Sequence, residues 1–223
     1  MNGKLIVIDG LDGSGKSTQH QLLIEALEKE NIPVKGISFP DYNSPSAALV
    51  NLYLQGAFGS TPDSVNAFAA SSFYAVDRYA SYKTVWEKDY RAGTNILAAR
   101  YTSSNLFYQM EKLPKEQWDD YIRWTLDYEY DRMEIPIPDC VIFLDMPPEI
   151  SRQLISSRYQ GDESLRDIHE QDFDYLCRCR ESALYACEKL GYQVLSCGEN
   201  GKPLSISDIF QKIQKKVNEV LSV

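Results

Sequence analysis

The chain has 223 residues, of which 43% are hydrophobic and 25% charged, a composition typical of a globular protein rather than a disordered or fibrous one. Its 23 lysines and arginines are outnumbered by 32 aspartates and glutamates, and the net charge of −9 argues against broad binding of nucleic-acid polymers or anionic membranes. Five cysteines without a C-x-x-C pair, no signal-like start and no membrane-length apolar run together favour a reduced, cytoplasmic protein.

Short apolar segments alternate along the chain with segments of helical periodicity. The last helix is expected to follow Ser205, a capping residue three positions before Asp208. The alternation predicts one α/β domain over residues 1–223, a three-layer fold with about five parallel strands and helices on both faces. The expected strands are Leu5–Ile8, Val34–Ser38, Asn95–Ala98, Cys140–Leu144 and Gln193–Leu195.

The first expected strand leads directly into a phosphate-binding motif. Residues 10–17 read Gly-Leu-Asp-Gly-Ser-Gly-Lys-Ser and match G-x4-G-K-[ST], in the strand-to-helix context that the motif requires. Backbone N–H groups and the helix N-terminus bind phosphates in such a loop, while Lys16 bridges the outer phosphates and Ser17 joins a Mg²⁺ shell. The motif predicts a nucleoside triphosphate site without defining what the triphosphate is used for.

Three classes of protein share this motif. A GTPase needs a guanine-reading N-K-x-D sequence, which this chain lacks. A motor or ATPase needs a strand that ends in a carboxylate, and Asp145 after Cys140–Leu144 fits that requirement, although it fits a turn or helix cap equally well. A small-molecule kinase needs an acceptor pocket and arginines that neutralise the transferred phosphoryl group.

Four further clusters of residues are typical of such an acceptor pocket. Tyr74 and Arg78 are four residues apart, so they share one helix face and can stack on a flat heterocycle and donate to its carbonyl group. The polar stretch 156–170 between two helices fits a lid and a solvated loop equally well. The clusters are Phe39-Pro40-Asp41-Tyr42, Tyr74 to Arg78, Arg100–Gln109, and Leu144–Glu149 leading to Arg158.

In this order and spacing the motifs resemble those of the thymidylate kinase family over nearly the whole chain. The family pattern joins G-[LV]-D/E-G-[AS]-G-K-[ST]-T to F-P-x-[YR], F-x-x-x-R, D-R-Y-x-x-S-[SN]-x-A-Y-Q and P-x-P-D-[LV]-x-[IF]-[YF]-L-D-x-[PD]-P-E. The matching segments here are residues 10–18, Phe39–Tyr42, Tyr74 to Arg78, Arg100–Gln109 and Pro136–Glu149.

The resemblance implies a phosphotransferase that converts dTMP to dTDP with ATP and Mg²⁺, for dTTP synthesis, in a homodimer packed through the helix that begins near Ser64. Lys16, Arg100 and the lid arginines Arg158 and Arg166 would be catalytic, and Ser17 would bind the metal. The implied ATP contacts are Gly10, Asp12, Gly13, Ser14, Gly15, Lys16, Ser17 and Thr18.

The implied acceptor site divides the parts of dTMP among different residues. Tyr74 would stack on thymine and Arg78 would donate to it, Asp12 would meet the deoxyribose 3′-hydroxyl, and Arg100 would hold the phosphate. The full implied set is Asp12, Phe39, Pro40, Tyr42, Tyr74, Arg78, Arg100, Tyr101, Ser104, Asn105, Tyr108 and Gln109.

One position departs from the family pattern. Ala99 stands where the family has the aspartate of D-R-Y, a residue that helps to organise Mg²⁺ and the acceptor phosphate. We therefore expect an active enzyme with altered metal dependence, in which Asp9 or Asp12 substitutes for the lost carboxylate. Two alternatives stay open: a kinase of another nucleotide or a deoxynucleoside, and a non-catalytic nucleotide sensor.

Overall fold

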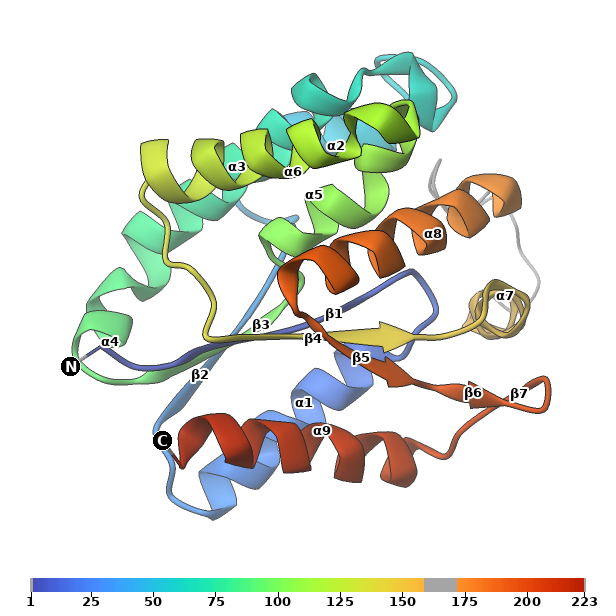
Figure 1. Ribbon diagram of the computed structural model, residues 1–223. Coiled ribbons are helices and arrows are strands. Elements are labelled where there is room, and N and C mark those ends of the chain that lie inside the picture. Colours follow the sequence, from blue (N-terminus) through green and yellow to red (C-terminus); the bar gives the residue numbers. More distant parts are fainter. Residues whose placement is uncertain (1, 159–171, 223) are drawn as a thin grey trace.

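A five-stranded parallel sheet forms the centre of the molecule (Figure 1). The computed structural model describes residues 2–158 and 172–222. The strand order is β2-β3-β1-β4-β5, and every strand begins at the predicted residue and ends at most two residues later than predicted. The predicted α/β fold is thus confirmed. The strands are β1 Leu5–Gly10, β2 Val34–Ser38, β3 Asn95–Ala99, β4 Cys140–Asp145 and β5 Gln193–Ser196.

Helices connect the strands and cover both faces of the sheet (Figure 1). They are α1 Lys16–Lys29, α2 Ala48–Leu54, α3 Ala67–Ser81, α4 Glu87–Arg91, α5 Thr102–Tyr108, α6 Trp118–Leu126, α7 Pro148–Arg158, α8 Phe173–Leu190 and α9 Ile206–Leu221. Two π-helical turns, Tyr82–Trp86 and Asp127–Arg132, continue α3 and α6. A small antiparallel hairpin of β6 Gly198–Glu199 and β7 Lys202–Pro203 precedes α9 and was not predicted.

Side chains of the three central strands alternate between two buried layers. Ile6 and Ile8 of β1 and Leu97 of β3 pack toward α1 and α9, whereas Val7 and Ala98 pack toward the helices of the opposite face. Because both of their faces are covered, these strands have the nearly continuous apolar sequences of a buried parallel sheet. Because of this alternation, polar side chains at the strand ends can contact one another only when they lie in the same layer.

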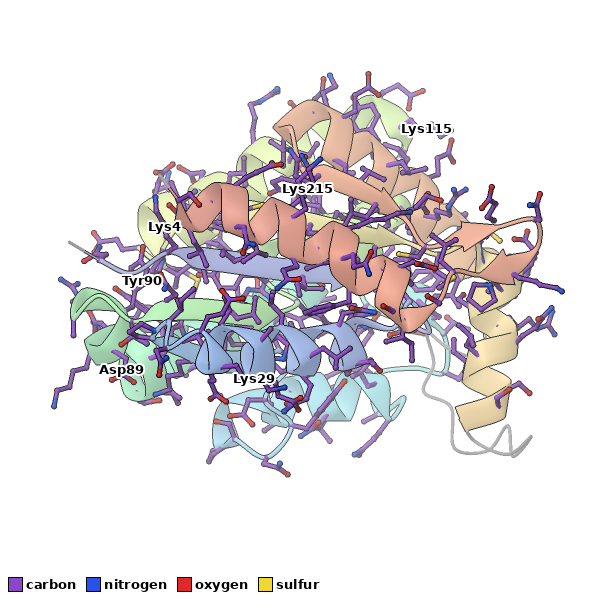
Figure 2. The ribbon with its side chains drawn as sticks, turned by 90° about the horizontal axis from the view of Figure 1, so that it is seen from below. Lys4, Lys29, Asp89, Tyr90, Lys115 and Lys215 are labelled. Atoms are coloured by element: carbon purple, nitrogen blue, oxygen red, sulfur yellow. The ribbon has the colours of Figure 1, made fainter. Side chains whose placement is uncertain are left out.

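Local signals in the sequence define several helix ends. Ser205 caps α9, as predicted, by accepting a hydrogen bond from the Asp208 backbone at 3.0 Å, and Ile209, Ile213 and Val217 form the buried stripe of the helix. Figure 2 views the molecule from below, where Lys29 of α1 and Lys215 of α9 lie among the exposed polar side chains of the two helices. In the described part of the chain, every helix is too short or too polar to cross a bilayer.

Candidate active site

The phosphate-binding loop lies between β1 and α1, at the carboxyl edge of the sheet. Gly15 precedes α1 in a left-handed conformation (φ 85°) that glycine adopts without strain. Position 10 also requires glycine, because a Cβ atom there would lie only 2.9 Å from the Leu144 carbonyl oxygen. Glycine at these positions lets the backbone turn tightly into the N-terminus of α1, whose positive end attracts an anion.

Lys16 lies across this loop. Its Nζ donates to the Leu11 carbonyl at 2.7 Å and contacts Ser14 Oγ at 3.4 Å, and the residue is buried. Ser17 and Thr18 are exposed in the first turn of α1. A phosphate in the loop would therefore meet a lysine that is already held close to its backbone.

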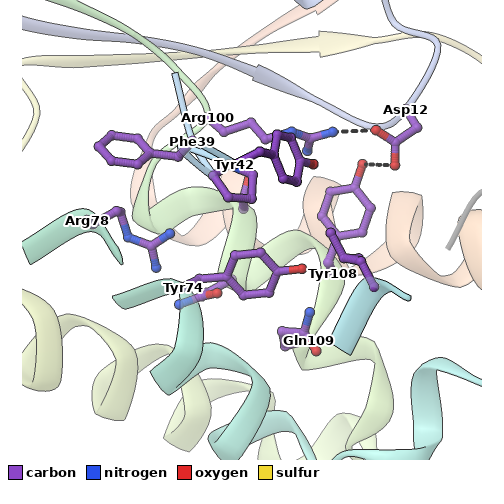
Figure 3. A pocket seen from close by; sticks show the side chains of 12 residues that line it. Asp12, Phe39, Tyr42, Tyr74, Arg78, Arg100, Tyr108 and Gln109 are labelled. Atoms are coloured by element: carbon purple, nitrogen blue, oxygen red, sulfur yellow. Dashed lines mark hydrogen bonds and ion pairs between the residues drawn. The ribbon is translucent and has the colours of Figure 1, made fainter. Parts of the chain in front are cut away.

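A cavity opens next to the loop, beyond the ends of β1, β2 and β3 (Figure 3). All residues predicted to contact the acceptor, with the exception of Tyr101, line it. Leu54, at the end of α2, lines it as well and was missed, because a single leucine outside any motif gives no signal in the sequence. The lining residues are Asp12, Phe39, Pro40, Tyr42, Leu54, Tyr74, Arg78, Arg100, Ser104, Asn105, Tyr108 and Gln109.

The structure places Tyr101 in the core instead of the cavity. Its ring centroid lies 5.9 Å from that of Phe39 and 6.5 Å from that of Trp86, and its hydroxyl donates to the Pro136 carbonyl at 3.0 Å. Tyr101 precedes α5 in extended conformation, which turns its side chain toward the sheet while the following residues face the cavity. Tyr101 thus supports Phe39 from behind and cannot be a direct acceptor contact.

Asp12 connects the phosphate loop to the cavity. Its carboxylate forms an ion pair with Arg100 and accepts a hydrogen bond from the Tyr108 hydroxyl at 2.9 Å (Figure 3). Burial raises the pKa of the Tyr108 hydroxyl well above its usual range, so this group is a neutral donor at neutral pH. The arrangement keeps an acidic, an aromatic and a cationic side chain together at one end of the cavity.

Arg100 is held in an unusual backbone conformation. Its φ is 66°, in the left-handed region, which costs a residue other than glycine roughly 1 kcal/mol. Its backbone N–H donates to the Ile8 carbonyl at 3.0 Å, and its guanidinium carbon lies 5.1 Å from the centre of the Tyr108 ring. These contacts direct the guanidinium into the cavity beside the loop.

Arg78 lies at the other end of the cavity, next to Tyr74 (Figure 3). Both its Nε and its Nη2 donate to the Glu129 carboxylate at 2.6 Å, and the two side chains are almost completely buried. Burial is the largest single effect and by itself would lower the pKa of the Arg78 guanidinium, but the charge and the hydrogen bonds of Glu129, with smaller contributions from nearby tyrosines, together raise it. Glu129 was missed in the sequence because it belongs to no recognisable motif.

The loop after β2 is attached to α3 by a second residue that sequence reasoning missed. The Asp77 carboxylate accepts hydrogen bonds from the Asp41 backbone at 2.9 Å and from Ser46 Oγ at 2.6 Å, and Asp77 is buried. Phe39, Pro40 and Tyr42 are therefore held over the cavity by the same helix that presents Tyr74 and Arg78.

Asp9, one of the two residues expected to compensate for Ala99, faces the other side of the sheet. Ala99 pairs with Ile8 and shares the α1 face of the sheet, whereas Asp9 pairs with Phe143 and faces α5. The Asp9 carboxylate accepts hydrogen bonds from Ser103 Oγ at 2.5 Å, from Ser104 Oγ at 2.9 Å and from the Gly10 backbone at 2.8 Å. Asp9 thus points to the opposite layer.

In residues 2–158 and 172–222 no group of three or more histidines, cysteines, aspartates and glutamates is placed to hold a metal ion. Mg²⁺ in nucleotide enzymes keeps several waters and needs few protein ligands beyond the phosphates. The exposed Ser17 hydroxyl fits this requirement for an ion that arrives with the nucleotide.

Asp145, the carboxylate that fitted the requirement of an ATPase, forms an ion pair with Arg180 of α8. Its carboxylate accepts hydrogen bonds from Arg180 Nε at 2.7 Å and Nη2 at 2.9 Å, in a two-pronged ion pair that joins β4 to α8. This pairing assigns Asp145 a structural role that explains its position after the strand.

The predicted lid falls largely outside the described residues. Arg166 belongs to residues 159–171, and Arg158 is the last residue of α7. The side chains of both arginines lie outside the described part of the chain, and the lid stays a prediction.

Comparison with known proteins shows the family to which the chain belongs. The sequence model of the thymidylate kinase family matches residues 8–203. A thymidylate kinase of Mycobacterium tuberculosis is 29% identical over 184 residues, covering 82% of this chain and 84% of the relative. One from Caenorhabditis elegans is 29% identical over 160 residues, covering 68% and 66%.

Solved structures agree on the fold. The thymidylate kinase of Candida albicans superposes with a TM-score of 0.71 at 22% identity, over 98% of this chain and 93% of the other. That of Ehrlichia chaffeensis superposes with a TM-score of 0.67 at 16% identity, over 97% and 100%.

Proposed function

This chain belongs to the thymidylate kinase family, and we propose that it transfers the γ-phosphoryl group of ATP to dTMP, giving ADP and dTDP. The observation that carries the proposal is the position of the cavity directly beside the phosphate loop. It has the anion-binding group Arg100 at the loop end and the heterocycle-binding pair Tyr74 and Arg78 at the other end. A nucleoside monophosphate is the ligand class whose phosphate and base match these two ends.

The residues of the chain position the reactants. The loop N–H groups and Lys16 bind the ATP phosphates, Arg100 holds the dTMP phosphate, and Asp12 accepts a hydrogen bond from the 3′-hydroxyl. An oxygen of the dTMP phosphate attacks the γ-phosphorus as the bond to the β–γ bridging oxygen breaks, and ADP leaves. Ser17 would hold Mg²⁺, which would neutralise the charge of the phosphates, and Arg158 and Arg166 of the proposed lid would stabilise the transferred group.

The proposal is tested by ADP formation with a panel of acceptors: dTMP, dUMP, dCMP and thymidine. We expect dTMP to be the preferred acceptor and thymidine to be inert, because Arg100 has no phosphate to bind in a nucleoside. Preference for another acceptor would assign a different kinase activity. ATP binding without ADP formation in the presence of any of these acceptors would favour the alternative of a non-catalytic nucleotide sensor.

Restoring the family carboxylate tests the metal dependence. An aspartate at position 99 would face the α1 side of the sheet, where Ser17 lies, because Ala99 pairs with Ile8 in that layer. For Ala99→Asp we expect the Mg²⁺ concentration that gives half-maximal turnover with dTMP to fall by about tenfold. An unchanged Mg²⁺ profile and rate would show that Ala99 has no bearing on the metal.

A homodimer packed through α3 and α6 is part of the proposal. One stripe of α3 exposes Phe68, Val76 and Tyr79, each about two-fifths exposed, and the Phe68 ring lies 4.8 Å from that of Trp124 on the adjacent α6. We expect sedimentation to give twice the 25.4 kDa chain mass for the native protein. Val76→Asp should shift it to the monomer, whereas Val194→Asp, on an equally exposed strand position, should not. A native monomer would contradict the dimer.

The five cysteines are free thiols. Their state is compatible with a reducing compartment, and we propose a cytoplasmic location on that ground.

A further inference from the structure

The Glu129 carboxylate lies behind the base end of the cavity and makes no part of its wall. It is completely buried in the π-helical turn Asp127–Arg132 and accepts hydrogen bonds from three side chains. Oε2 accepts from Arg78 Nε at 2.6 Å and Thr102 Oγ1 at 2.8 Å, and Oε1 accepts from Arg78 Nη2 at 2.6 Å and Asn105 Nδ2 at 2.8 Å. Four donors fill the acceptor capacity of the carboxylate.

This carboxylate determines which face of Asn105 a ligand meets. An ionised carboxylate only accepts hydrogen bonds, so the Asn105 amide must turn Nδ2 toward Glu129. Nδ2 also donates to the Ser71 carbonyl at 3.2 Å, which uses its second hydrogen. Because Asn105 lines the cavity, Oδ1 is the amide atom that a ligand can still bond, and it is an acceptor.

The same carboxylate orients Arg78. The Nε and Nη2 atoms of Arg78 are directed at Glu129, so the guanidinium presents Nη1 to a ligand. Nη1 is a hydrogen-bond donor. Arg78 Nη2 and Asn105 Nδ2 converge on one oxygen, Oε1, so the two side chains are neighbours. The base end of the cavity therefore offers a donor beside an acceptor.

We propose that Glu129 is a positioning residue that makes the site specific for a keto pyrimidine over an amino pyrimidine. Thymine and uracil present the O4 acceptor beside the N3–H donor, which complements Arg78 and Asn105. Cytosine presents the N4 amino donor beside the N3 acceptor, which opposes both. The inference rests on the proposed function and extends it to a residue that never touches the ligand.

The test is the binding of dTMP and dCMP to the Glu129→Gln variant. A glutamine at this position brings its amide nitrogen against an Arg78 N–H donor in either orientation, so Arg78 loses its fixed position. Where that nitrogen also faces Asn105, the Asn105 amide no longer has an acceptor that holds Nδ2 inward, and its fixed orientation toward the ligand is lost. We expect dTMP affinity to fall by about 30-fold or more and the ratio of dTMP to dCMP affinity by at least about tenfold. ATP affinity should stay within about twofold.

A matched control separates this effect from a general loss of packing. Glu111 is another buried carboxylate paired with an arginine, at 2.7 Å from Arg178, and it lies outside the cavity. Glu111→Gln should leave the dTMP to dCMP ratio unchanged. If Glu129→Gln does not fold, Thr102→Val removes one donor to Glu129 at nearly constant volume and should lower the ratio by about threefold.

The outcomes separate the inference from the function on which it rests. Native protein that prefers dTMP, together with a Glu129→Gln ratio that is unchanged, overturns the inference and leaves the proposed function in place. An unchanged ratio of dTMP to dCMP affinity in Thr102→Val, where that variant is the one measured, likewise overturns the inference and leaves the proposed function in place. Native protein that binds neither monophosphate overturns the proposed function and the inference with it.

Discussion

Replacing Lys16 by methionine should lower kcat/KM for ATP and dTMP by about 10³-fold while the protein stays folded. The amine is the cation that the phosphate loop itself supplies, and its position beside the Leu11 carbonyl keeps it at the loop backbone where the phosphates bind. Methionine retains most of the apolar stem, so the buried volume changes little. The measurement is steady-state turnover with saturating Mg²⁺, together with thermal unfolding of each variant.

Lys35→Met provides the control for the loss of Lys16. Lys35 pairs with Asp89 at 2.6 Å and is not among the residues of the loop or the cavity wall. Its substitution should change turnover by less than about twofold. A Lys16→Met enzyme with near-native turnover would remove the phosphate loop from the mechanism.

Arg100→Met is expected to raise KM for dTMP by about 10²-fold, with ATP binding nearly unchanged. Two effects act together: the acceptor phosphate loses its cation, and the Asp12 carboxylate, no longer paired with Arg100, repels the incoming phosphate. Arg178→Met is the matched control, because Arg178 also pairs with a carboxylate, that of Glu111, outside the cavity. An equal rise in KM for ATP and dTMP would show that Arg100 is not specific for the acceptor.

The strands and the phosphate loop could be predicted because their causes are local. Apolar runs bounded by polar segments define buried strands, and the glycines of residues 10–15 are required by close backbone approach and by positive φ. Most of the cavity wall was also predicted, since Phe39–Tyr42, Tyr74 to Arg78 and the Arg100 segment each follow a strand or share a helix face.

Residues that act through tertiary contacts escaped prediction. Glu129 and Asp77 are single acidic residues whose importance depends on a partner far along the chain, Arg78 for one and Ser46 for the other. Tyr101 shows the opposite error, because membership of a motif says nothing about which layer a side chain enters. The pairing of Ala99 with Ile8 puts residue 99 in the layer opposite Asp9, and that register is visible only in the sheet.

The most direct test of the proposed reaction is separation of the nucleotides formed when the purified chain is incubated with ATP, Mg²⁺ and dTMP. Transfer between the phosphate loop and the Arg100 cavity predicts ADP and dTDP in equal amounts, with both products lost in Lys16→Met. ADP accompanied by inorganic phosphate and no dTDP would indicate an ATPase, and ATP left intact would indicate a non-catalytic protein. Either result would contradict the proposed function.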